Sequence, residues 1–145
     1  MDLSYIIIPI IILFSSQVLK LLTDGIKGNF DLKNLFSSYG GMPSSHTALS
    51  VSITTLVGLR NGFESPIFAV SLIFTLLIMR DAVAFRGLLG KQAEVFNRLT
   101  NSLKDKKSAK SGDAILFRER MGHSVIEVTA GVVWGVGLTY FLNLL

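Results

Sequence analysis

Residues 40–46 read Gly-Gly-Met-Pro-Ser-Ser-His, and they join a polar stretch of the chain to an apolar one. Glycine allows backbone conformations that a Cβ atom forbids, and proline suits the first turn of a helix. We therefore expect a helix to begin here, with the hydroxyls of Ser44 and Ser45 capping its free N–H groups. His46 then lies in the first turn, where the helix dipole attracts anions.

The composition indicates an integral membrane protein. Half of the 145 residues are hydrophobic, only 17% are charged, and the mean hydropathy is +0.54. Soluble domains of this length are usually less apolar, and the length fits a single domain covering residues 1–145. The chain has no cysteine, so it forms no disulfide and no thiolate metal site. We expect the membrane, and no nucleic acid, as a partner.

Four apolar segments predict an all-α bundle of about four transmembrane helices. A bilayer of about 30 Å needs roughly 20 apolar residues per helix. The second segment is short and rich in serine and threonine, which favours helix–helix contact over lipid contact. Gly131 and Gly135 are four residues apart in the last segment, a spacing typical of tightly packed membrane helices. The segments cover about residues 5–22, 44–59, 66–84 and 123–142.

The connecting segments are polar or amphipathic. Residues 23–42 form a loop with a short interfacial turn at 32–36. Apolar residues recur at helical spacing over 89–103, which predicts an amphipathic helix that lies along the membrane surface or caps the bundle. A basic linker follows at 104–112. Loop 23–42 and segment 87–121 are expected on the same side of the membrane.

Four alternating crossings bring the polar candidates of the spans to one membrane side. Ionisable groups at membrane depth are costly and indicate function, although Lys20 snorkelling to the headgroups and a local Arg80–Asp81 ion pair are the structural alternatives. Of the basic residues only Arg60 falls on the other side, so the positive-inside rule makes the site side cytoplasmic and both termini external. The gathered residues are Lys20, His46, Arg80, Asp81, Arg86 and His123.

Two histidines among several cations suit phosphoryl transfer. One neutral imidazole can attack phosphorus, and the other can protonate the leaving oxygen and then activate water. Cations and helix N-terminal amides stabilise the charge on the phosphoryl oxygens. Glu127 follows His123 by four residues, which is the spacing of a carboxylate that fixes the tautomer of the ring, although such pairs are common by chance.

These residues resemble a known superfamily. Residues 43–46 resemble the Pro-Ser-Gly-His motif of the type-2 phosphatidic acid phosphatases, a superfamily that includes the vanadium haloperoxidases. His123 followed by Glu127 resembles its third motif, a histidine with an aspartate four residues on. Together with segments 80–86 and 92–93, the chain from Gln17 onward is similar to the divergent bacterial and plant branch of that superfamily.

The resemblance implies a role for each matching residue. His123 would be the nucleophile that forms a phosphohistidine, Glu127 would orient it, and His46 would act as acid and then as base. Ser44, Ser45 and the neighbouring amides would hold the phosphate, and Lys20 resembles the lysine of the first motif. These enzymes use no metal or other cofactor. The further candidates for binding phosphate are Arg80, Arg86, Arg118 and Arg120, with Asp81 beside them.

Four departures from the superfamily pattern stand out. No arginine–proline pair follows Lys20, and Ser45 replaces a glycine. Phe117 occupies the position of an arginine, for which Arg118 or Arg120, or Arg80 and Arg86, would substitute. Glu127 lengthens the orienting arm by one methylene. The usual relatives also have more helices and an exterior active site, so a homo-oligomer could complete the site here.

The sequence therefore predicts a membrane phosphatase acting on a lipid phosphate or diphosphate through a phosphohistidine. The alternative is a non-catalytic binder or transporter of phosphorylated lipid that uses the same anion pocket. A third hypothesis is a small structural membrane protein in which the two histidines only cap helices.

Overall fold

The computed structural model describes residues 3–26, 41–106, 116–117, 119 and 122–145, and every regular element in these ranges is a helix. A five-residue π-helical turn, η1, joins α4 to α5 without a break. The elements are α1 (Ser4–Ile26), α3 (Ser45–Asn61), α4 (Pro66–Arg80), η1 (Asp81–Phe85), α5 (Arg86–Lys106) and α6 (Val125–Asn143). The all-α prediction is confirmed for the described residues.

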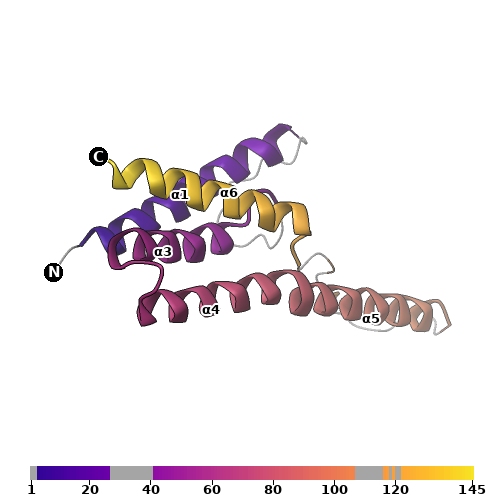
Figure 1. Ribbon diagram of the computed structural model, residues 1–145. Coiled ribbons are helices and arrows are strands. Elements are labelled where there is room, and N and C mark those ends of the chain that lie inside the picture. Colours follow the sequence, from indigo (N-terminus) through magenta and orange to yellow (C-terminus); the bar gives the residue numbers. More distant parts are fainter. Residues whose placement is uncertain (1–2, 27–40, 107–115, 118, 120–121) are drawn as a thin grey trace.

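The helices of the bundle run in alternating directions, and the two chain ends lie at the same end of it (Figure 1). A polar cluster joins the helix ends there. Arg60 Nε donates to Asn143 Oδ1 at 2.7 Å, and a second nitrogen of Arg60 donates to Ser4 Oγ. The Tyr5 hydroxyl donates to Asn61 Oδ1 at 2.7 Å. The start of α1 and the ends of α3 and α6 therefore meet, which leaves the predicted site at the opposite end.

Helix α3 is the centre of the bundle and contacts α1, α4 and α6. Several of its hydroxyl groups hydrogen-bond to neighbouring helices. Thr54 Oγ1 and Thr75 Oγ1 lie 2.8 Å apart, and Thr75 also donates to the Ser50 carbonyl at 2.9 Å. On another face Thr139 donates to Ser52 Oγ at 2.8 Å. The hydroxyl-rich second segment thus packs against three other helices, as its composition predicts.

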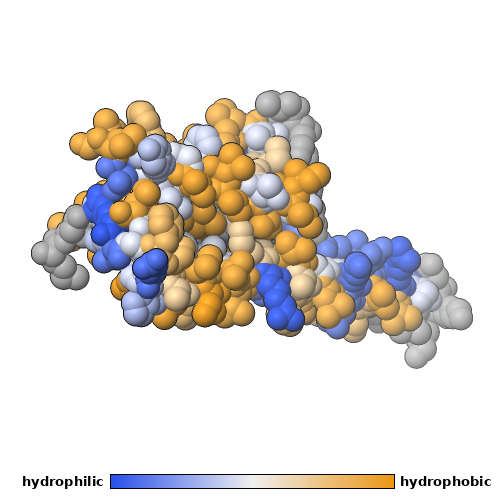
Figure 2. All heavy atoms as spheres, in the orientation of Figure 1, coloured by the Kyte–Doolittle hydropathy of each residue, from blue (hydrophilic) through white to orange (hydrophobic). Residues whose placement is uncertain are grey.

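Among the residues that the structure describes, three helices are long and apolar enough to cross a membrane, rather than the four that we expected. They are Ser4–Thr23, Pro66–Ser102 and Val125–Asn143. Helix α3 is not among them because it has 17 residues and many polar side chains that face the other helices. Figure 2 shows the matching surface, with a hydrophobic centre and hydrophilic residues at one end of the bundle and along the α5 arm.

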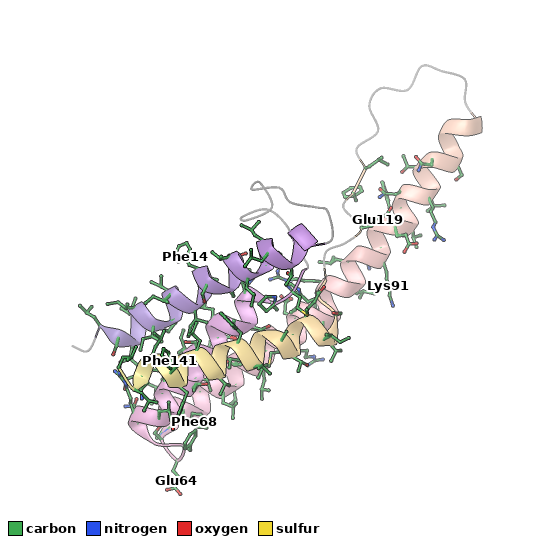
Figure 3. The ribbon with its side chains drawn as sticks, turned by 90° about the horizontal axis from the view of Figure 1, so that it is seen from above. Phe14, Glu64, Phe68, Lys91, Glu119 and Phe141 are labelled. Carbon is green, nitrogen blue, oxygen red and sulfur yellow. The ribbon has the colours of Figure 1, made fainter. Side chains whose placement is uncertain are left out.

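The amphipathic helix forms as predicted, but its direction differs from the prediction. Helix α5 continues the line of α4 and projects beyond the bundle (Figure 1) instead of lying across the bundle end. In Figure 3, Lys91 belongs to this arm, Glu119 lies beside it, and Glu64 lies at the opposite end of the molecule. The reason is that the helical hydrogen bonding is not interrupted: the Arg86 N–H still bonds to the Asp81 carbonyl.

Two predicted features fall largely outside the described residues. Most of loop 23–42, including its interfacial turn, and most of the linker 104–112 belong to the ranges 27–40 and 107–115.

Residues 116–117 are described, and they pack on α5. Asn97 is buried, its Nδ2 donates to the Phe117 carbonyl at 2.7 Å, and its Oδ1 accepts from the Phe117 N–H at 2.9 Å.

The predicted close packing at Gly131 and Gly135 is confirmed. A Cβ atom on Gly131 would lie 2.6 Å from the Ser44 carbonyl oxygen, and one on Gly135 would lie 2.7 Å from that of Ala48. Both values are shorter than real Cβ contacts, and the obstacle is backbone, which cannot rotate away. The two glycines therefore set how closely α6 approaches the start of α3.

Replacing Gly135 by alanine should lower the free energy of unfolding by about 1–3 kcal/mol, because α6 must move away from α3. Gly137→Ala is the matched control on the same helix, because a Cβ atom there meets nothing within 4 Å. Alanine at that position should be neutral or slightly stabilising. Thermal unfolding in detergent, followed by circular dichroism, measures both. Equal stability of the two variants would contradict this account of the interface.

Candidate active site

The first turn of α3 is not capped by serine side chains in the way that the sequence predicted. Ser44 occupies the N-cap position, but its side chain makes no capping hydrogen bond and instead accepts from Thr47 Oγ1 at 2.9 Å. Its backbone N–H donates to the Glu127 carbonyl at 2.9 Å. Ser45 is 5% exposed, and its buried Oγ has no hydrogen-bond partner among the described residues. The prediction that Ser44 caps this helix is wrong, and the first turn keeps its capacity to bind an anion.

His46 is the second residue of α3, outside the three candidate spans. Although part of its surface is exposed, the surrounding protein lowers the pKa of His46 below its usual value of 6.5 by desolvation. Arg86, His123 and Lys20 lower this pKa further through their charges, and Asp81 raises it. Four of the predicted site residues, from α1, η1, α5 and the start of α6, therefore lie within electrostatic range of one imidazole.

His123 and Glu127 meet as predicted, with Nδ1 and Oε2 3.0 Å apart and their side chains only 8% and 12% exposed. His123 lies just before the helix, because α6 begins at Val125 with Ser124 as its N-cap. The contact arises from a capping box, in which Glu127 Oε2 also accepts from the Ser124 N–H at 3.1 Å and Ser124 Oγ accepts from the Glu127 N–H at 3.2 Å. A carboxylate at Nδ1 favours the tautomer that leaves the Nε2 lone pair free.

The π-helical turn fixes the backbone of His123. The Ala82 carbonyl accepts from the His123 N–H at 3.0 Å. Asp81 pairs with Arg86, with 2.8 Å between Oδ2 and Nε, and the local alternative in which Asp81 pairs with Arg80 is not what the structure shows. Such turns inside α-helices occur frequently at functional sites. The turn therefore holds a nucleophile candidate and a cation candidate in one place.

Gly122 allows this contact. A Cβ atom on Gly122 would lie 2.7 Å from the Gly87 nitrogen, so the residue before His123 passes directly over the first turn of α5. A Cβ atom on Gly87 would meet nothing within 4 Å, so the contact requires a glycine only on the His123 side. The sequence-based prediction did not include this close approach.

Lys20 is buried, with 7% of its surface exposed. One turn later Thr23 Oγ1 lies 2.9 Å from the Lys20 carbonyl and 2.6 Å from the Met42 carbonyl, which ties α1 to the chain just before Ser44. A buried side chain favours a role at the site over snorkelling to the headgroups. Thr23 therefore positions the end of α1 against residue 42, a role that the sequence did not reveal.

Of the other three arginines predicted to bind phosphate, the structure describes only Arg80. Arg80 is exposed, and its guanidinium lies 5.8 Å from the centre of the Phe85 ring, a surface cation–π contact. Arg118 and Arg120 lie outside the described residues. Within the described ranges, no three His, Asp or Glu side chains form a set that could hold a metal ion.

These features define a class: a helical bundle of membrane type whose polar site is built where the end of α1, the starts of α3 and α6, and η1 converge. Residues 1–138 match the divergent PAP2 family, and the chain belongs to that family. The chain is 41% identical over 117 residues to the uncharacterized membrane protein YuiD of Bacillus subtilis (strain 168), an alignment covering 75% of this chain and 74% of that one. No solved structure matches it. The resemblance noted in the sequence is confirmed at the level of the family.

Neutralising the charges around His46 should move its pKa in opposite directions. Arg86→Gln should raise it, because a positive charge is lost, and Asp81→Asn should lower it further, because a negative charge is lost. The measurement is an NMR titration of isotope-labelled histidine in detergent micelles, with Lys91→Gln on the projecting arm as the control. Shifts in the same direction for both variants would contradict the arrangement.

Proposed function

We propose that this protein is an integral membrane phosphatase that hydrolyses a lipid phosphate or diphosphate through a phosphohistidine intermediate. The observation that carries the proposal is the 3.0 Å contact between His123 Nδ1 and Glu127 Oε2 in a largely buried pair. A carboxylate-oriented imidazole with a free Nε2 is the arrangement that a histidine nucleophile requires. Family membership supports the same reaction class.

In the first step, Nε2 of His123 attacks phosphorus and forms an N–P bond. The bond between phosphorus and the leaving oxygen breaks, and protonated His46 donates its proton to that oxygen. Glu127 stabilises the positive charge that develops on the ring of His123. Burial and nearby cations lower the pKa of His46, and a bound phosphate dianion opposes that effect, so substrate binding itself promotes the acid form of His46.

In the second step, neutral His46 removes a proton from water as the water oxygen attacks phosphorus. The N–P bond breaks, inorganic phosphate leaves, and His123 regains its neutral form. His46 keeps the proton it has taken and is ready to act as the acid of the next cycle. One histidine is therefore a nucleophile, and the other alternates between acid and base.

Charge stabilisation comes from groups at the start of α3 and around it. The first-turn amides of α3 and the buried Ser45 hydroxyl, which has no partner inside the described structure, can bind phosphoryl oxygens. Lys20 and Arg86 act on His46 through their positive charges and can do the same on a phosphate bound there. Arg80, Arg118 and Arg120 stay predictions as phosphate ligands. The hydroxyl that replaces the glycine of the superfamily motif thus adds a hydrogen-bond donor.

The test is phosphate release from dioleoyl phosphatidic acid and from a prenyl diphosphate by purified protein in detergent. His123→Ala should reduce release to background, and His46→Asn should reduce it by on the order of 10²–10⁴. With substrate labelled in the phosphate, the wild type should yield an acid-labile phosphohistidine at His123. Lys91→Ala, on the exposed arm, is the control and should keep the wild-type rate.

Wild-type turnover in His123→Ala would refute the nucleophile assignment. Tight binding of the phosphorylated lipid with no turnover and no phosphohistidine would favour the alternative, a non-catalytic binder or transporter.

We further propose that the site faces the cytoplasm, since the topology predicted from the sequence puts every lysine and arginine except Arg60 on that side. The chain has no cysteine, so single cysteines report topology cleanly. In intact cells a membrane-impermeant maleimide should modify Glu64→Cys, at the opposite end, and should modify Lys91→Cys only after lysis. The reverse pattern would place the site outside.

A further inference from the structure

An apolar groove of about 470 Å³ runs beside the proposed active site, between α1, residues 42–43 and α6. This volume falls in the range of ligand pockets in proteins. One wall is a row of α6 residues on successive turns: Ile126, Ala130 and Trp134. At a rise of 1.5 Å per residue the row is about 12 Å long, parallel to the helix axis.

The groove is held open by fixed contacts. Trp134 Nε1 donates to Ser15 Oγ on α1 at 3.1 Å, which anchors the indole at the deep end of the row. Leu19 lines the groove from α1, one turn further toward the site. The tie between α1 and α6 through the indole keeps the two walls at a defined separation, so the space does not depend on a ligand to form.

The other end of the groove reaches the polar site. Thr23 lines the groove, and its hydroxyl lies within hydrogen-bond distance of the Lys20 and Met42 carbonyls. Pro43, which also lines it, directly precedes Ser44, and Val125 follows His123 by two residues. The groove therefore ends beside residues that flank the proposed phosphate site in the sequence.

We propose that this groove binds one hydrocarbon chain of the substrate while the phosphate occupies the site at its mouth. The inference rests on the proposed function and narrows its substrate class to lipids with a long chain. The walls of the groove are apolar, and it ends beside the proposed phosphate site, where Lys20 and Arg86 act on His46 through their positive charges. A ligand that complements both parts carries an anionic group at one end and an apolar chain along its length.

A second cavity provides an internal control. It has about 430 Å³ and lies between α3, α4 and α6, where its lining includes Phe63 and Tyr140 from the far end of the bundle. Val132 lines this second cavity, and Ala130 lines the groove. Both residues are half-buried on α6, two positions apart. Phenylalanine at each position therefore fills one cavity and leaves the other open.

The experiment compares kcat/KM for long-chain dioleoyl and short-chain dihexanoyl phosphatidic acid in detergent. Ala130→Phe should lower the ratio of long-chain to short-chain kcat/KM by roughly tenfold or more, because it removes the apolar contacts of the chain. Val132→Phe should leave that ratio near the wild-type value. If Ala130→Phe does not fold, Ala130→Leu is tested in its place, with a smaller decrease expected.

Crosslinking with phosphatidic acid that carries a diazirine in its chain gives a readout independent of turnover. Crosslinks should concentrate on residues 126–134 and Leu19, and they should decrease in Ala130→Phe but not in Val132→Phe. Crosslinks at the groove in a protein without turnover would support chain binding in the groove and refute the proposed function. Turnover with an unchanged long-chain to short-chain ratio in Ala130→Phe, or crosslinks spread evenly over both cavities, would refute chain binding in the groove.

Discussion

Two backbone hydrogen bonds hold the site together, and the rest of the arrangement depends on them. The Ser44 N–H donates to the Glu127 carbonyl at 2.9 Å, and the His123 N–H donates to the Ala82 carbonyl at 3.0 Å. The first joins the starts of α3 and α6, and the second joins the start of α6 to the π-helical turn. Because the bonds are between backbone groups, they fix where the chain passes and leave the side chains free for chemistry.

Packing along the bundle makes these bonds possible. Gly131 lets α6 approach α3 so closely that a Cβ atom there would clash with the Ser44 carbonyl oxygen, and Gly135 is in the same position against the Ala48 carbonyl one turn later. At the far end Arg60 bonds to residues of α1 and α6 and fixes their register. Small residues near the site and a polar cluster at the other end therefore together fix how α1, α3 and α6 pack. The oriented His123 is a consequence of how α3 and α6 pack.

The sequence predicted the helices, because each apolar segment is recognised from its local composition. It also predicted that the polar candidates lie at one end of the bundle, because successive helices alternate in direction. It also predicted the His123–Glu127 contact from spacing, although His123 precedes the helix and the contact arises from a capping box. Residues 81–85 contain no helix-breaking residue, so their π-helical form and the line of α5 were not predictable. The role of Ser44 depends on a partner in α6, which no local pattern reveals.

The central claim is that His46 and His123 share one phosphoryl group. A structure of the protein with bound vanadate, which adopts the geometry of the transferring phosphate, tests it most directly. We predict vanadium bonded to Nε2 of His123, with the His46 ring and Ser45 Oγ within hydrogen-bond distance of its oxygens. Vanadate bound elsewhere, or packed aliphatic side chains separating the two imidazoles, would contradict the account.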